Sequence, residues 1–167
     1  MPQFSALLPV FAQDEALHRV LESIDHGESG CVVAPAGARI PLIASMAQRR
    51  DKTIYVVVPT GREAEETASA LRAWVEDVEV FPSWETLPHE RLSPQVDTMA
   101  QRIAVLRRLI HPQSGDEHAG ALNVVVIPVR ALMQPIIHGI ADRAHVRVKA
   151  GDIVDLPNLA RELEDLG

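Results

Sequence analysis

The sequence predicts an α/β fold in which helices cover both faces of a doubly wound parallel sheet. Short runs of almost wholly apolar residues alternate with stretches whose apolar residues recur every three or four positions. The short runs lack an apolar/polar alternation, as is typical of parallel strands buried on both faces. Hydrophobic residues make up 47% of the 167 residues, which is enough apolar material for a core.

The predicted order of elements begins with an amphipathic helix at residues 16–24, which ends at Gly27. The continuous apolar run at residues 30–34 predicts the first strand. Cys31 lies in that run, so we expect a small buried side chain rather than a reactive thiol. Because Cys31 is the one cysteine of the chain, it cannot form an internal disulfide, which is consistent with a reducing cytoplasm.

A second helix is expected after the turn at residues 35–37, with Pro41 tolerated in its first turn. Residues 53–58 then predict the second strand, since they are apolar and β-branched. Thr60 and Glu63 have the spacing of a capping box, which indicates the start of a third helix. The inner side of that helix is expected to consist of Ala64, Ala68, Leu71 and Val75.

Two further strands are predicted at residues 78–81 and 122–127. Between them, Ser93 as N-cap and Pro94 as first helical residue predict the start of a long helix. A short helix is expected near residues 130–134. The apolar residues of the long helix follow a three-four spacing: Val96, Met99, Ile103, Leu106 and Ile110.

The C-terminal residues 144–167 predict the first strand and helix of a truncated second, small α+β domain, after a first domain at residues 1–143. Residues 145–149 alternate between apolar and polar, and Asp155 precedes a predicted helix. One strand and one helix cannot bury their own apolar faces. The apolar side of this helix is expected to contain Leu159, Leu163 and Leu166.

The junction after residues 30–34 lies where phosphate-loop proteins carry G-x-x-x-x-G-K-S/T. In that motif, the lysine neutralises phosphate and the hydroxyl holds magnesium. Here Ile40 stands at the lysine position and Pro41 at the hydroxyl position. We therefore predict a degenerate loop without a cofactor; a strand-to-helix turn of an unrelated α/β protein is the alternative. The motif positions are occupied by Ala34, Gly37, Arg39, Ile40 and Pro41.

The predicted loop at residues 81–94 is dense in distinctive residues, namely Phe81, Trp84, Glu85, Thr86, Leu87, Pro88, Ser93 and Pro94. It resembles the N-terminal region of the Mfd family of transcription-repair coupling factors, in which a W-E-T-L-P-Y segment follows the third strand. His89 stands where a tyrosine is common in that family. The resemblance extends to residues 8–10 and 124–134, and so covers nearly the whole chain.

The resemblance implies an N-terminal module similar to the repair protein UvrB, with a degenerate phosphate loop, and a second small domain that recruits UvrA. It also implies later domains that bind RNA polymerase and that use ATP and Mg to translocate on DNA, displacing polymerase stalled at damage. This chain would then be a non-catalytic interaction module that contacts the rest of the protein. A cytoplasmic location is expected separately, because the N-terminus lacks the pattern of a signal peptide. The alternative is a nucleotide-dependent ATPase like UvrB, which keeps the lysine and threonine that Ile40 and Pro41 replace.

The net charge of −7 argues against a free-standing nucleic-acid-binding domain. Arg102, Arg107 and Arg108 form a basic streak on one predicted helix, for which a solvated face is favoured over a contact with DNA or a partner. We expect Trp84 to pack its loop onto the sheet rather than to stack on a base or anchor a partner. The histidines lack the spacing of a zinc site, and no apolar run is long enough to span a membrane.

Overall fold

The computed structural model describes residues 2–49, 52–86, 95–113, 120–136, 139–141, 148 and 151–166. The chain divides into two compact units, Met1–Pro135 and Ile136–Gly167, and each is described by itself. The domain boundary predicted after residue 143 stays a prediction. The first unit contains, in order, η1 (Ser5–Leu7), α1 (Leu8–Phe11), α2 (Glu15–Asp25), η2 (Ala36–Ala38), α3 (Arg39–Arg49), β1 (Ile54–Val58), α4 (Gly61–Arg72), β2 (Val78–Val80), α5 (Val96–Ile110), β3 (Val124–Pro128) and α6 (Val129–Leu132).

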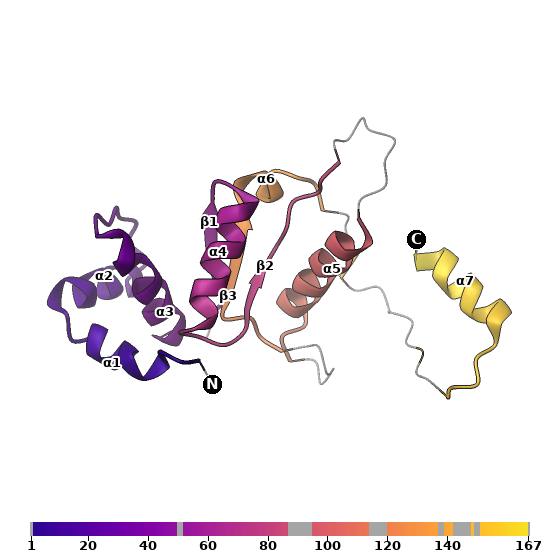
Figure 1. Cartoon of the computed structure of the whole chain (residues 1–167), viewed down its shortest axis with the longest axis horizontal. Coiled ribbons are helices and arrows are strands. Elements are labelled where there is room, and N and C mark those ends of the chain that lie inside the picture. Colours follow the sequence, from indigo (N-terminus) through magenta and orange to yellow (C-terminus); the bar gives the residue numbers. More distant parts are fainter. Residues whose placement is uncertain are drawn as a thin grey trace. The chain divides into compact units, whose positions relative to one another are not determined.

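The described strands form a three-stranded parallel sheet in the order β1-β3-β2, visible at the centre of Figure 1. Ile54 of β1 and Val78 of β2 both lie opposite Val124 of the central strand. All five residues of β3 are buried, as expected of a parallel strand with neighbours on both sides. An α/β fold with a parallel sheet is thus confirmed, while its likeness to a phosphate-loop nucleotide-binding fold stays a prediction.

Helices pack on both faces of the sheet, in two separate apolar clusters. On one face, Val124 and Val126 pack with residues of α3 and α4, including Ala47 and Leu71. On the other face, Val125 and Ile127 pack with Val105 of α5. The inner side predicted for α4 is confirmed at Ala64, Ala68 and Leu71, whose exposed fractions are 0%. Val75 is also buried, at 5%, but it lies beyond the end of the helix at Arg72.

The strand predicted at residues 30–34 is wrong. These residues belong to no helix or strand, and all five are exposed, with Val33 at 95%. Cys31 is exposed as well, so the prediction of a buried cysteine is wrong too. An apolar run indicates a preference for extended backbone, but a strand also needs a neighbour to accept its hydrogen bonds. Among the strands that the structure describes, none lies beyond β1 to pair with this run.

The buried face of α5 differs from the predicted one. Thr98, Arg102 and Val105 are its buried residues, whereas Val96 is 76% exposed and Ile110 is 52% exposed. The helix is rotated away from its most apolar stripe because Thr98 and Arg102 bind the segment that follows β2. It begins at Val96, and the predicted cap residues Ser93 and Pro94 lie outside the described residues.

Two helix starts show the expected capping chemistry. The Thr60 hydroxyl oxygen accepts a hydrogen bond from the Glu63 amide at 3.2 Å, which confirms the predicted start of α4. The Asp14 carboxylate caps α2 in the same way, accepting from the Leu17 amide at 2.9 Å. Each side chain satisfies a backbone N–H that the first helical turn leaves unpaired.

The second unit contains α7 (Leu156–Leu166), which confirms the helix predicted after Asp155. The predicted strand at residues 145–149 lies outside the described residues, except for Val148, which is in no strand. Leu156 at the start of α7 is 72% exposed. Within the described parts of both units, no helix has the length and apolar character needed to cross a membrane.

Candidate functional site

The segment at the phosphate-loop position turns directly from an extended stretch into helix. Ala36–Ala38 form the single turn η2, and Arg39 begins α3. Gly37 does not have a positive φ, and a Cβ atom added to it would meet nothing within 4 Å. The glycine is therefore not needed here for a close backbone approach, which is its purpose in a phosphate-binding loop.

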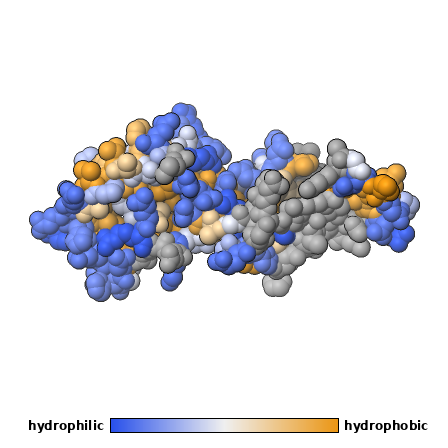
Figure 2. Space-filling model, turned by 90° about the horizontal axis from the view of Figure 1, so that it is seen from below, coloured by the Kyte–Doolittle hydropathy of each residue, from blue (hydrophilic) through white to orange (hydrophobic). Residues whose placement is uncertain are grey.

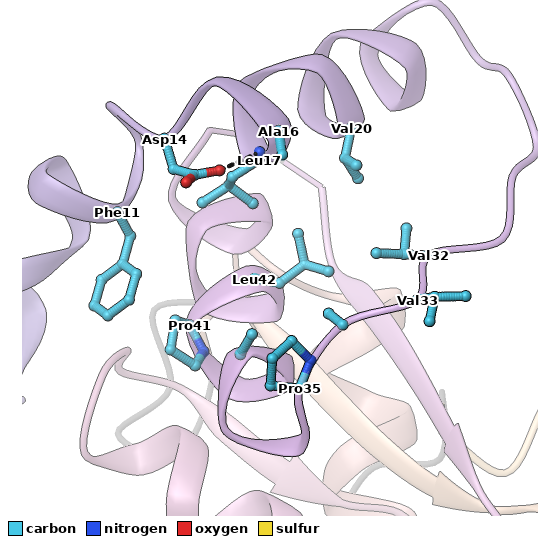
Figure 3. A pocket seen from close by; sticks show the side chains of 12 residues that line it. Phe11, Asp14, Ala16, Leu17, Val20, Val32, Val33, Pro35, Pro41 and Leu42 are labelled. Atoms are coloured by element: carbon cyan, nitrogen blue, oxygen red, sulfur yellow. Dashed lines mark hydrogen bonds between the residues drawn. The ribbon is translucent and has the colours of Figure 1, made fainter.

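An apolar pocket with a volume of about 400 Å³ lies beside this segment. Figure 3 shows Leu17 and Val20 of α2 and Leu42 of α3 pointing into it, with Val32 on the opposite wall. The residues that line the pocket are Phe11, Asp14, Ala16, Leu17, Val20, Val32, Val33, Ala34, Pro35, Ala38, Pro41 and Leu42.

The pocket has the wrong chemistry for a nucleotide phosphate. Its lining contains no lysine or arginine, and its one ionisable residue is the acidic Asp14. Pro41 is buried in α3 and has no backbone N–H to donate. Ile40 is half-buried and packs against the apolar cluster, so it belongs to the core rather than to a binding loop.

The N-terminal wall of the pocket is held by aromatic packing. The rings of Phe4 and Phe11 lie 5.4 Å and 5.6 Å from the Trp74 ring, measured between centroids. The Phe4 amide also donates to the Ala73 carbonyl oxygen at 2.8 Å. Figure 2 shows apolar side chains at the surface over these N-terminal helices, where Val10 is 62% exposed.

A second cluster lies where the chain leaves β2, at the carboxyl edge of the sheet. The Arg102 side chain comes up from α5, and its Cζ atom lies 4.1 Å from the centroid of the Phe81 ring and 4.4 Å from that of Trp84. Arg102 is 2% exposed, and its guanidinium donates to the Pro82 carbonyl oxygen at 2.6 Å. Burial lowers the pKa of Arg102. The cation therefore lies between two aromatic faces and a carbonyl oxygen.

The backbone of Trp84 is held by one side chain, that of Gln134, which follows α6. The Trp84 amide donates to Gln134 Oε1 at 2.7 Å, and Gln134 Nε2 donates to the Trp84 carbonyl oxygen at 3.3 Å. The side-chain amide of Gln134 thus bonds both the N–H and the C=O of Trp84, as the backbone of a neighbouring strand would. Trp84 itself is half-buried, an arrangement that fits the predicted structural role; the role itself stays a prediction.

Glu85 ties the same segment to the start of α5. The Thr98 hydroxyl donates to Glu85 Oε1. This hydrogen bond is the largest cause that holds the pKa of Glu85 below its ordinary value; the nearby charge of Arg130 contributes less. Of the predicted motif residues, Phe81, Trp84 and Glu85 thus meet α5 and α6, while Leu87, Pro88, Ser93 and Pro94 lie outside the described residues.

The basic streak predicted for Arg102, Arg107 and Arg108 is not a solvated face. Arg102 is buried, and the Arg108 side chain is only 14% exposed. Arg108 Nη2 lies 2.5 Å from an Asp77 carboxylate oxygen, and its Nη1 lies 3.4 Å from Glu79 Oε1. Asp77 has a φ of 54°, a conformation that the hydrogen bond from Asn123 to its carbonyl oxygen helps to fix. Arg108 thus holds the turn before β2, whereas Arg102 holds the segment after it.

Among the described residues, no three histidine, cysteine, aspartate or glutamate side chains are grouped so that they could hold a metal ion. Sequence reasoning missed the two residues that organise the second cluster, Arg102 as a buried cation and Gln134 as a backbone partner. A signal was available for Arg102, because it falls on the same helical face as Thr98 and Val105. For Gln134 nothing local indicated a partner fifty residues away.

Comparison with known proteins identifies relatives of one kind. The chain is 42% identical over 137 residues to the transcription-repair-coupling factors of Mycobacterium bovis and Mycobacterium tuberculosis, a match that covers 81% of this chain and 11% of each relative. It is 27% identical over 145 residues to the transcription-repair-coupling factor of Haemophilus influenzae, covering 86% of this chain and 12% of that protein. No protein-family model matches the chain.

The matched region is the N-terminal one, so the resemblance inferred from the segment after β2 is confirmed. The chain spans about a tenth of the length of these relatives.

Proposed function

We propose that this chain, which is homologous to the N-terminal region of the transcription-repair coupling factors, is a non-catalytic interaction module of transcription-coupled DNA repair. Its role is to present surfaces to other parts of the repair machinery in the cytoplasm. Nucleotide chemistry, displacement of stalled RNA polymerase and DNA translocation with ATP and Mg belong to other parts of a longer protein.

One observation carries this proposal: the environment of the phosphate-loop position. A nucleotide triphosphate needs backbone N–H groups, a cation and a hydroxyl-bound magnesium ion around its phosphates. At this position the chain instead has Ile40 packed in the core, Pro41 without an N–H, and an adjacent pocket lined by apolar side chains and Asp14. A polyphosphate placed there would lose its hydration and meet a carboxylate, so binding is unfavourable.

We propose UvrA as the partner, met mainly through the domain to which the second unit, Ile136–Gly167, contributes. RNA polymerase and DNA would be bound by later parts of a longer protein. The first unit contributes a rigid platform, since the segment after β2 is tied to α5 and to Gln134, which follows α6. The remaining candidate function, a nucleotide-dependent ATPase like UvrB, has no described residue to support it at the loop position.

The experiment is a calorimetric titration of the chain with ATP and magnesium. We expect no heat of binding up to about 1 mM ATP, where a functional phosphate loop would be saturated. A phosphate-loop ATPase titrated in the same buffer provides the positive control, and ADP provides a second ligand for the chain. Saturable binding in the micromolar range would favour the ATPase and contradict the interaction-module proposal.

A further inference from the structure

The run at residues 30–34 has backbone groups that no described residue uses. It lies between the end of α2 and the turn η2, and none of its residues has a positive φ. Within the part of the chain that the structure describes, none of its N–H or C=O groups takes part in a hydrogen bond. Ala34 precedes Pro35, and a residue before proline favours extended backbone. The run is therefore an unpaired, extended edge to which another strand can bond.

The same run forms one wall of the apolar pocket beside α2 and α3. Val32 lies across the pocket from Leu17, Val20 and Leu42 (Figure 3). The volume of about 400 Å³ is within the range of roughly 300–1,000 Å³ that is typical of ligand pockets. In a strand paired with the run, every second side chain points to the same face as Val32. Those side chains would enter the pocket.

The charge of the pocket is negative. Of the described residues that line it, Asp14 alone carries a charge. Asp14 Oδ1 accepts from the Leu17 amide at 2.9 Å, while the second carboxylate oxygen has no hydrogen bond within the described part of the chain. The complementary group is therefore a cation, because an anion placed here would meet only a carboxylate and apolar side chains.

Lysine and arginine side chains combine the two properties that this pocket selects. Each has an apolar stem that packs on apolar surface and a charged end that stays near water or a carboxylate. Figure 3 shows Asp14 at one end of the pocket, and Val20 and Val32 at the other. A basic side chain can thus reach Asp14 while an apolar side chain two positions along the same strand packs against Val20 and Val32.

We propose that the pocket binds an extended segment of a partner protein, in which basic and apolar residues alternate, and that this segment adds a strand to residues 30–34. Main-chain hydrogen bonds to the run supply affinity, and the two side chains in the pocket supply specificity. The net charge of −7 favours the approach of a basic segment. The inference rests on the proposed interaction role and adds a partner that the first unit binds by itself, apart from UvrA.

Two other occupants fit the pocket less well. An amphipathic helix bonds its own backbone groups internally and would leave those of the run unused. An anionic lipid surface would be repelled by Asp14 and by the net charge of the chain. An extended basic-apolar segment uses the run, the apolar walls and Asp14 together.

The test is a calorimetric titration of the chain with a short synthetic peptide in which lysine alternates with valine. We expect saturable one-to-one binding with a dissociation constant below about 100 µM. The amides of residues 31–34 should gain protection from hydrogen exchange when the peptide is added. Methylating every second backbone nitrogen of the peptide keeps its charge but removes N–H donors, so the dissociation constant should rise at least ~10-fold. Glutamate in place of lysine should abolish binding.

Asp14→Asn separates the charge from the helix cap, because asparagine caps a helix as well as aspartate does. It should raise the dissociation constant at least ~5-fold and leave thermal melting unchanged. Glu65→Gln removes a charge from an exposed side chain of α4 and is the matched control, with no change expected. Ala16→Trp should fill the pocket and abolish binding.

Three results would overturn the proposal. The first is the absence of binding to the lysine–valine peptide. The second is equal binding of the N-methylated peptide, because the peptide would then not pair with the run. The third is an unchanged dissociation constant in both Asp14→Asn and Ala16→Trp, because the peptide would then bind elsewhere. None of these results alters the outcome expected for ATP, so failure of this inference and failure of the proposed function can be told apart.

Discussion

Replacing Arg102 with alanine removes a buried cation that the structure uses as a packing element. Its Cζ atom lies 4.1 Å and 4.4 Å from two aromatic ring centroids, and each such contact contributes about 1–2 kcal/mol when it is shielded from water. Loss of the hydrogen bond to Pro82 costs a further ~1.5–3 kcal/mol, because the donor is charged. Relief of the desolvation that lowers the Arg102 pKa offsets part of this loss. We expect a net destabilisation of about 3 kcal/mol.

The assay is urea unfolding of Arg102→Ala, Arg102→Lys and Arg102→Met. The unfolding free energies are compared on the condition that the m-value is the same for all variants. Lysine keeps the charge but loses the flat guanidinium face, so an intermediate loss is expected. Methionine keeps much of the volume and separates packing from charge. Arg62→Ala is the control: its side chain is 87% exposed and pairs with Glu66 at 2.8 Å, so the loss should stay below ~0.5 kcal/mol. A loss below ~1 kcal/mol for Arg102→Ala would show that Arg102 does not hold the segment after β2.

Two further predictions concern the same cluster. Trp84→Ala should lower stability by about 2–4 kcal/mol, because a large aromatic side chain leaves a packed site; unchanged thermal melting together with lost partner binding would show an exposed anchor instead. Glu85 has a folded pKa below its ordinary value, so its contribution to stability is present above that ordinary value and is lost as the pH falls through the folded pKa. The difference in unfolding free energy between the parent chain and Glu85→Gln should therefore shrink between about pH 7 and about pH 3. Thr98→Val should abolish that pH dependence, because it removes the hydroxyl that donates to Glu85. A difference that is independent of pH would contradict the role of this hydrogen bond.

Much of the α/β arrangement could be predicted from the sequence because apolar periodicity reports burial directly. The apolar runs around Val56 and Val126 lie in the sheet, and the capping pair at Thr60 marks the start of α4. The run at residues 30–34 failed because pairing depends on a partner strand that local sequence does not specify.

The face of α5 could not be predicted from hydrophobicity alone. Periodicity placed Val96 and Ile110 inside, but Thr98 and Arg102 are buried because their partners come from the segment after β2. Because arginine is rarely buried, a sequence-based prediction places it on the surface. Its burial can be expected only where a carbonyl oxygen and aromatic faces are known to surround it. At the phosphate-loop position, by contrast, the sequence alone was informative. Ile40 and Pro41 stand where the motif has a lysine and a hydroxyl, and this needs no structure to recognise.

The measurement that tests the central claim most directly compares UvrA capture by two lengths of chain. The 167-residue chain and one extended beyond Gly167 to complete the second domain are immobilised at equal density, and UvrA is passed over both. If this protein is an interaction module that meets UvrA mainly through the second domain, the longer chain should capture UvrA and the shorter one should capture it poorly. Equal capture by both would move the UvrA surface onto the first unit, and capture by neither would contradict the proposed interaction.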